Sequence, residues 1–149
     1  MIVEQIDLYQ VSQELVSPFV TSFGRQLERQ CLILAKHGDG LTGWGECVAN
    51  SYPGYSYETS GTAWLILSQH LIPAVLGRDL QQPEQVAGWM NSVRGHPLAK
   101  AAIDQAAWDI TAQRDGVSFA EKLAEPYPKG AKQRVQVGVS IGIQSAIDD

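Results

Sequence analysis

Acidic residues and histidines are the side chains of this sequence that could perform acid–base or metal chemistry. Asp104 and Asp109 lie in one predicted helix, about 140° apart around its axis at ~100° per residue, so they do not share a face. Glu46, in the stretch GWGEC, is expected to fix a strand end or a loop by hydrogen bonds. The three histidines fall in different predicted elements, at surface or helix-end positions: His37, His70 and His96. These residues predict neither an acid pair nor a metal site.

Two cysteines and one glycine-rich stretch are the other chemically suggestive features. Cys31 and Cys47 form no CxxC motif, so two buried, reduced thiols are the simplest interpretation. A disulfide between neighbouring strands is the alternative, and a metal site would need more ligands than two cysteines supply. The stretch GWGECVANSYPG lacks the strand–GxGxxG–helix context of a nucleotide-binding loop.

The composition limits the classes of partner. The chain has 149 residues, of which 44% are apolar, enough for one domain with a substantial core. The net charge is -5 and there is no basic cluster, so neither nucleic acid nor an anionic membrane is expected as a partner. The start, MIVEQIDLYQ, lacks the pattern of a secretory signal, and no apolar run reaches the length of a membrane span. We therefore predict a cytoplasmic protein.

The N-terminal third is predicted to be a three-stranded antiparallel meander. Residues 2–11 alternate between apolar and polar side chains, and residues 27–36 and 41–49 form two further strand-like runs around the turn residues HGDG. Residues 14–26 contain Pro18, a glycine, hydroxyls and aromatics, and are predicted to be a loop between the first two strands.

The middle of the chain is predicted to be helical. After a loop over residues 50–60, three helices are expected: Ala63 to Pro73, Pro83 to Met90, and Pro97 to a stop signal at Gly116. Ser118 and Glu121 have the spacing of a capping box for one further short helix. Residues 125–134 are polar, contain two prolines and form the predicted linker. Strands followed by helices indicate an α+β fold.

The last apolar stretch, residues 135–143, has the pattern of a strand covered on both faces. Valine and isoleucine alternate with small or uncharged residues, which is typical of strands in parallel sheets. A parallel neighbour requires a crossover connection, and residues 144–149, QSAIDD, have the pattern of a helix that is beginning. The sequence therefore predicts a strand–helix unit that is not completed, and hence an incomplete chain.

Several stretches together carry a family resemblance. In chain order they are PFVTSFGR at 18–25, GWGECVANSYPGYSYE at 43–58, LIP at 71–73, GHPLAKAAIDQAAWD at 95–109 and VGVSIGI at 137–143. In this order and spacing the chain resembles the o-succinylbenzoate synthases. More narrowly, it resembles the branch of the enolase superfamily that overlaps the N-succinylamino acid racemases.

The resemblance implies a capping domain over residues 1–130 and, over residues 131–149, the start of a (β/α) barrel. Residues 135–143 would be the first strand of the barrel, whose strands are covered on both sides. Enzymes of this superfamily abstract a proton α to a carboxylate and hold the enediolate on Mg²⁺ or Mn²⁺. In the family the metal ligands and catalytic lysines lie on later barrel strands. We therefore assign no catalytic residue and no metal ligand in this chain.

The resemblance also implies that two loops of the capping domain close over the substrate. The matching stretches, Ser17–Arg25 and Ala49–Tyr57, are apolar and aromatic with few charges, which suits a lid that excludes water. The residues expected to face substrate are Val20, Phe23, Asn50 and Tyr55. Ser140 is expected to hydrogen-bond a substrate carboxylate. The alternatives are plain packing for the loop residues and, for Ser140, selection for small size in a crowded barrel.

The function implied by the resemblance is a metal-dependent dehydratase or racemase that acts on a small-molecule carboxylate. The candidates are o-succinylbenzoate synthase of the menaquinone/phylloquinone pathway, N-succinylamino acid racemase, or both. A muconate cycloisomerase or dipeptide epimerase relative is one alternative, and a non-catalytic cap that binds small acids or a protein partner is another. The complete enzyme is expected to be a homo-oligomer, and the 149-residue segment alone is expected to be inactive.

Overall fold

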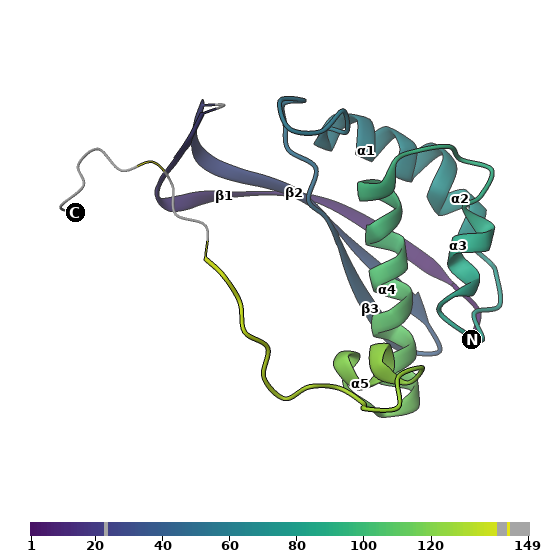
Figure 1. Ribbon diagram of the computed structural model, residues 1–149. Coiled ribbons are helices and arrows are strands. Elements are labelled where there is room, and N and C mark those ends of the chain that lie inside the picture. The colour runs from purple at the N-terminus through teal and green to yellow at the C-terminus, as the bar shows by residue number, and fades with distance from the viewer. Residues whose placement is uncertain (23, 140–142, 144–149) are drawn as a thin grey trace.

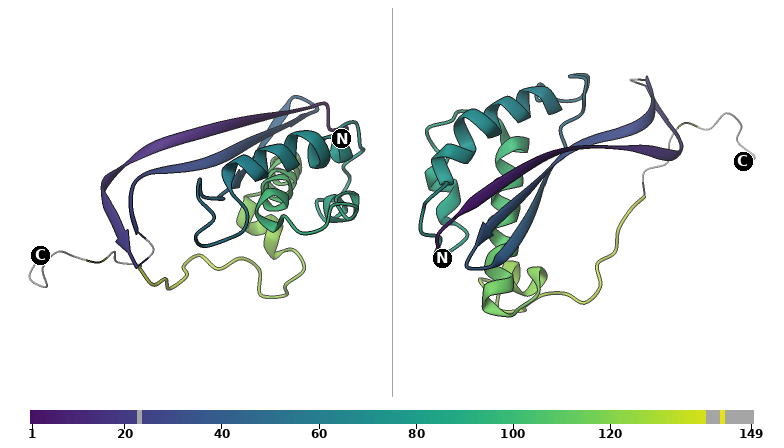
Figure 2. Two further views of the ribbon diagram at one scale, coloured as in Figure 1. Left: turned by 90° about the horizontal axis from the view of Figure 1, so that it is seen from above. Right: turned by 180° about the vertical axis from the view of Figure 1, so that it is seen from behind.

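A three-stranded antiparallel sheet with helices on one of its faces forms the body of the molecule (Figure 1, Figure 2). The computed structural model describes residues 1–22, 24–139 and 143. The strands are neighbours in sequence and in space: β1 (Gln5–Thr21), β2 (Gly24–Gly38) and β3 (Leu41–Cys47). The structure thus confirms the α+β class and the three-strand meander.

The helical elements follow the strands in the chain. In order they are α1 (Ser60–Ile66), the π-helical turn η1 (Leu67–Leu71), α2 (Ile72–Val75), α3 (Gln85–Trp89), α4 (Pro97–Asp115) and α5 (Phe119–Ala124). The first predicted helix does not end at Pro73 but continues to Val75. A π-helical turn changes the hydrogen-bond pattern just before Pro73, where proline has no N–H to donate. No helix in the described part of the chain is long and apolar enough to cross a membrane.

Strands β1 and β2 continue beyond the helical layer as a two-stranded ribbon (Figure 1). The loop predicted between them is therefore wrong for most of its length. The register shifts between the pair Glu14–Glu28 and the pair Phe19–Gln26, so four residues of β1 face a single residue of β2. Pro18 lies in this bulge, where a residue without an N–H costs the ladder nothing. The proline that indicates a loop is accommodated by an irregularity within the strand.

Helix α4 packs unusually close to β3. A Cβ atom on Gly45 would overlap the carbonyl oxygen of Ala102, and one on Gly43 would overlap that of Ala106. The facing stripe of α4 consists of small and branched buried residues: Ala99, Ala102, Ile103, Ala106, Ala107 and Ile110. The glycines of GWGEC are therefore needed for helix–sheet packing, which agrees with the prediction that they form no nucleotide loop.

Side chains of α4 also form hydrogen bonds with backbone groups along the outer edge of β3. The backbone N–H of Trp44 donates to Asp109 Oδ2 at 2.8 Å, and that of Glu46 donates to Gln105 Oε1 at 3.0 Å. Gln113 Nε2 donates to the carbonyl oxygen of Thr42 at 2.8 Å. The three α4 residues are spaced four apart and so lie on one face. They protect an edge strand that would otherwise present unpaired backbone groups.

The end of α4 and the start of α5 agree with their sequence signals. Gly116 closes α4 in a left-handed conformation with φ 69°. Ser118 and Glu121 form the predicted reciprocal capping box at the start of α5. Residues 125–134, the predicted linker, are exposed and irregular.

The predicted strand over 135–143 is wrong for the part of it that the structure describes. Residues 135–139 are irregular, and the apolar side chains of Val135, Val137 and Val139 are 69%, 87% and 83% exposed. Within residues 1–22, 24–139 and 143, no strand pairs with this stretch. A strand needs neighbours that both bond its backbone and cover its side chains. Figure 1 shows the segment running from α5 towards the tip of the β1–β2 ribbon.

Candidate functional site

The first predicted lid stretch forms the tip of the β1–β2 ribbon. Val20 is half-buried in β1, paired with Arg25, and its carbonyl oxygen accepts a hydrogen bond of 2.8 Å from the backbone N–H of Ile143. The structure thus brings Ile143 to this tip. Phe23 and Ser140, two of the predicted site residues, lie outside the described residues.

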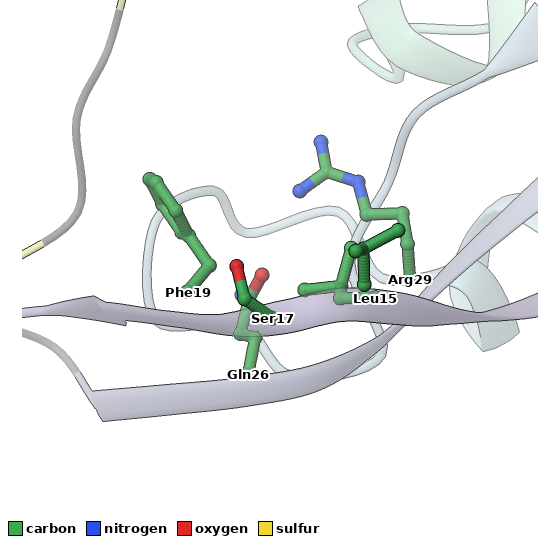
Figure 3. Close-up of a pocket in the computed structure, with 6 residues that line it drawn as sticks. Leu15, Ser17, Phe19, Gln26 and Arg29 are labelled. Atoms are coloured by element: carbon green, nitrogen blue, oxygen red, sulfur yellow. The ribbon is translucent and has the colours of Figure 1, made fainter.

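A shallow hollow of about 490 Å³ lies beside the bulge in this ribbon. It is lined by Leu15, Val16, Ser17, Phe19, Gln26 and Arg29. Figure 3 shows Leu15, Phe19 and the Arg29 guanidinium standing on the same side of the strands. The lining offers apolar surface and a guanidinium, but neither a carboxylate nor an imidazole for proton transfer. Val20, Asn50 and Tyr55 do not line this hollow, so it does not join the predicted site residues.

The second predicted lid stretch, Ala49–Tyr57, is a loop, as expected. The backbone N–H of Ser60 donates to the carbonyl oxygen of Asn50 at 2.9 Å, which brings the two ends of the loop together. Asn50 is half-buried at this closure, whereas Tyr55 is 87% exposed at the outer part of the loop. An exposed tyrosine on a loop with closed ends can contact a partner molecule through both its ring and its hydroxyl.

Glu58, directly after this loop, is a buried carboxylate that the sequence analysis missed. Its side chain is inaccessible to solvent and accepts hydrogen bonds from the backbone N–H groups of Leu98 at 2.9 Å and Ala99 at 3.1 Å. These are orphan donors in the first turn of α4, which the negative charge also stabilises through the helix dipole. The sequence indicates only that a remote cap is needed, because α4 begins at Pro97 without a Ser, Thr, Asp or Asn before it, and this signal does not identify Glu58.

His96 precedes α4 and lies next to the same carboxylate. It adopts a left-handed conformation with φ 55° and ψ 49°, and makes no side-chain cap of its own. Its Nδ1 lies 4.0 Å from Glu58 Oε2 and has no hydrogen-bond partner among the described residues. The ring of Tyr57 meets the His96 ring edge-on, with centroids 6.4 Å apart. The prediction that His96 is a helix-end residue agrees with this position.

The two aspartates of α4 interact with different strands of the sheet, as their angular separation predicts. Asp109 bonds the edge of β3, whereas Asp104 faces the buried Lys36 of β2. Burial lowers the pKa of Lys36 to about 8, an effect that the nearby Asp104 partly offsets. Lys36 Nζ donates to the carbonyl oxygen of Ile103 at 3.3 Å. This group joins helix to sheet in the core and is closed to a substrate.

The two cysteines are free thiols on β2 and β3. Burial raises the pKa of Cys47, and burial together with a hydrogen bond to Glu46 raises the pKa of Cys31. Raised pKa values keep both groups protonated and weakly nucleophilic. The structure thus has free thiols at both positions, and Cys47 is buried as predicted, whereas Cys31 is only half-buried. It also places the Glu46 carboxylate beside Cys31 rather than in an acid pair.

The described residues do not fit a metal site. Within residues 1–22, 24–139 and 143, no group of three or more His, Cys, Asp or Glu side chains is placed to hold an ion. The three histidines remain in separate elements, and His37 bonds Thr42 and Asp7 at the sheet surface. No catalytic step can be derived from a metal held by these residues.

The comparison with known families decides the identity of this fold. The N-terminal domain of the mandelate racemase / muconate lactonizing enzyme family matches residues 5–123. The chain belongs to this family. A solved member of the enolase superfamily from Listeria innocua Clip11262 matches 99% of this chain and 39% of its own, with a TM-score of 0.88 and 30% identity. The sheet and helices described above are the N-terminal capping domain of that superfamily.

Curated relatives narrow the branch. An o-succinylbenzoate synthase from Geobacillus stearothermophilus is 41% identical over 149 residues, which are 99% of this chain and 38% of the relative. An N-succinylamino acid racemase from Thermus thermophilus is 38% identical over 149 residues, 100% of this chain and 39% of the relative. The chain therefore spans less than two fifths of the length of these relatives, which belong to the branch that the sequence resembles.

Proposed function

We propose that the chain is the substrate-capping part of an enzyme that removes a proton α to a carboxylate. The proposed activity is that of o-succinylbenzoate synthase, N-succinylamino acid racemase, or both. The observation that carries the proposal is the alignment of the whole chain with relatives of these two names at about 40% identity. Fold alone would not carry it, because one fold hosts many activities.

In this proposal the two lid stretches contact the substrate rather than perform the proton transfer. The ribbon tip and the loop Ala49–Tyr57 lie on the side of the molecule away from the N-terminus (Figure 1, Figure 2). Exposed Tyr55 and half-buried Val20 and Asn50 are proposed, with Phe23, to contact the part of a small carboxylate substrate remote from the reacting carbon. Such contacts exclude water and orient the substrate. Ser140 is proposed to reach the substrate carboxylate.

The remaining parts of the proposal concern the complete protein. The capping domain would occupy residues 1–130, and residues 131–149 would begin a barrel in which the exposed valines of the 135–139 stretch become covered. The barrel would hold Mg²⁺ or Mn²⁺, which stabilises the negative charge that develops on the carboxylate oxygens. A homo-oligomer in the cytoplasm, acting in menaquinone synthesis, completes the proposal.

A chimeric enzyme tests the proposal directly. Residues 1–149 of this chain would replace the aligned 38% of the Geobacillus stearothermophilus synthase, leaving the rest of that relative unchanged. Dehydration of the cyclohexadiene acid would be followed by absorbance, and racemisation of N-succinylamino acids by α-deuterium exchange in D₂O. The unmodified relative and its barrel without a cap are the controls.

We expect the chimera to fold and to regain at least one of the two activities above the level of the barrel without a cap. The ratio of the two activities then reports which substrate the new cap prefers. A chimera that is folded by circular dichroism and binds Mg²⁺, yet turns over neither substrate, would favour a non-catalytic or different-substrate cap and contradict the proposal.

A further inference from the structure

The loop Ala49–Tyr57 is attached to the rest of the capping domain at its ends. Asn50 and Ser60 close it through their backbones, and Thr59 begins α1 with a capping box to Thr62. The outer part carries Tyr52 and Tyr55, which are 77% and 87% exposed. The position of the outer part is therefore determined by what holds the ends.

The contact between Glu58 and α4 is the strongest of these attachments. Glu58 accepts hydrogen bonds from Leu98 and Ala99, which lie 40 and 41 positions later in the chain. Hydrogen bonds to a carboxylate are stronger than those between neutral groups. The carboxylate is fully buried, so water cannot replace a lost partner. The backbone N–H of Glu58 also donates to Ser56 Oγ at 3.2 Å, which fixes the last residues of the loop against the same point.

Tyr57 reinforces the same attachment through its contact with His96. Tyr57 packs edge-on against His96, and a Cβ on Gly95 would lie 3.4 Å from the Tyr57 hydroxyl. His96 and Gly95 both have positive φ, so the turn before α4 has a defined shape against which Tyr57 and Glu58 pack. The loop end and the helix start therefore form one unit.

We propose that Glu58 is a positioning residue, which places the substrate-facing loop Ala49–Tyr57 by anchoring its end to the first turn of α4. The inference rests on the proposed function for its effect on substrate, but not for the anchoring itself. Glu58 touches no substrate, and its effect passes through the position of Asn50 and Tyr55. A displaced loop should raise KM and lower kcat together, because the lid both binds and orients substrate.

The test compares two carboxylate caps of the same chemistry. E58Q keeps the shape of the side chain but replaces one accepting oxygen with an NH₂ group that faces a backbone N–H. E121Q makes the equivalent change in the capping box of α5, where Glu121 Oε2 accepts from Ser118 N at 2.8 Å. E121Q weakens a capping box that glutamine can still close, with Ser118 remaining as the N-cap. Only Glu58 joins the loop to a helix.

The first measurement is amide hydrogen exchange of the 149-residue chain under native conditions. We expect E58Q to speed exchange at the amides of Glu58, Ser60, Leu98 and Ala99 by about tenfold, the change that one charge-assisted hydrogen bond corresponds to. E121Q should leave these amides unchanged and affect only the start of α5. Equal exchange at these amides in E58Q, E121Q and the unmodified chain would overturn the anchoring.

The second measurement is kinetic, in the chimeric enzyme. We expect E58Q to raise KM and lower kcat, while E121Q changes neither. Unchanged KM and kcat in an active E58Q chimera would overturn the positioning role. An inactive unmodified chimera would instead count against the proposed function, and hydrogen exchange would still decide the anchoring.

A second variant covers the case in which E58Q fails to fold. H96N removes the ring that packs against Tyr57, and asparagine tolerates the left-handed backbone at this position. It leaves both hydrogen bonds of Glu58 in place. Because these bonds remain, we expect the Leu98 and Ala99 amides to stay protected and the KM of the chimera to change little. Faster exchange at these amides together with a higher KM in H96N would show that the His96–Tyr57 contact, rather than Glu58, holds the loop, and would overturn the proposal.

Discussion

Lys36 shows how a single charged side chain can be retained in the core of a small domain. It is fully buried between β2 and α4, where its ammonium donates one hydrogen bond, to Ile103. Desolvation penalises the charged form more than the attraction of Asp104 favours it, so the pKa falls from 10.5 to about 8. At neutral pH the lysine is therefore charged at a cost to stability.

Replacing Lys36 with methionine should remove this unfavourable contribution to the free energy of unfolding. Between about pH 8 and 10.5 the unfolded chain holds a proton that the folded chain has released, so the free energy of unfolding rises with pH in that window. The rise attributable to Lys36 is about 3 kcal/mol at one pKa unit per 1.36 kcal/mol. Urea unfolding of the unmodified chain and of K36M, at pH 7.5 and at pH 10, measures it.

The difference between the two proteins isolates the lysine, because the other side chains are the same in both. We expect K36M to be at least as stable at pH 7.5, since methionine fills a similar volume without a charge. Its advantage should shrink as the pH rises to 10. A difference that does not change with pH would show that Lys36 keeps an ordinary pKa in the folded protein.

Individual site residues were only partly predictable from the sequence. The loop carrying Asn50 and Tyr55 could be located, because tyrosine, serine, proline and glycine concentrate there. Glu58 could not be distinguished from any other glutamate, since its partners lie 40 and 41 residues away. Only a structure brings the loop end to the start of α4.

At the scale of elements, the glycines of β3 determine how closely α4 approaches the sheet. Helix ends were predictable because caps and stop signals are local, as at Gly116 and Ser118. The path of β1 was not, because the bulge at Pro18 depends on pairing with β2 across the ribbon. The strand–helix distance likewise depends on residues far apart in sequence, Gly45 and Ala102.

Gly45 is the position at which this close packing can be tested. G45A would force a methyl group into the backbone of α4 at Ala102, and we expect a loss of about 3 kcal/mol or more, at the upper end for overpacking. G88A is the matched control, since Gly88 lies in α3 with nothing within 4 Å of an added Cβ. It should stabilise by about 0.5–1 kcal/mol. Thermal and urea unfolding of both variants measure these changes. A neutral G45A would show that α4 can move away from β3 at little cost.

At the scale of the whole molecule, the described residues comprise a packed capping domain and an exposed, irregular stretch over residues 125–139. The core cluster runs from Val3 to Ile110, and α5 closes the helical part at Ala124. The exposed linker over residues 125–134 was predictable, because its polar, proline-containing composition is a local signal, whereas the division into domains at residue 130 stays a prediction. The sequence also predicted a strand that does not form among the described residues of 135–143, because strand formation requires neighbours that sequence pattern alone does not supply.

Trypsin should cut the chain first in this C-terminal stretch. Lys129, Lys132 and Arg134 are exposed in irregular backbone, whereas Arg25 and Arg29 lie in paired strands. Proteases require a locally extended chain, so we expect a resistant product that ends between Lys129 and Arg134. Mass spectrometry identifies its end, and circular dichroism should show the same thermal midpoint as the intact chain.

The same digestion of the chimeric enzyme distinguishes a flexible tail from the first strand of a barrel. If neighbouring strands cover Val135, Val137 and Val139, the segment becomes paired and buried, and cleavage at Arg134 should slow relative to the isolated chain. Cleavage at Lys129, within the proposed connection between the domains, should remain fast and serves as the internal control. Equal cleavage at Arg134 in both proteins would mean that the apolar stretch is not taken up by the barrel, and a domain boundary near residue 130 would then have no structural basis.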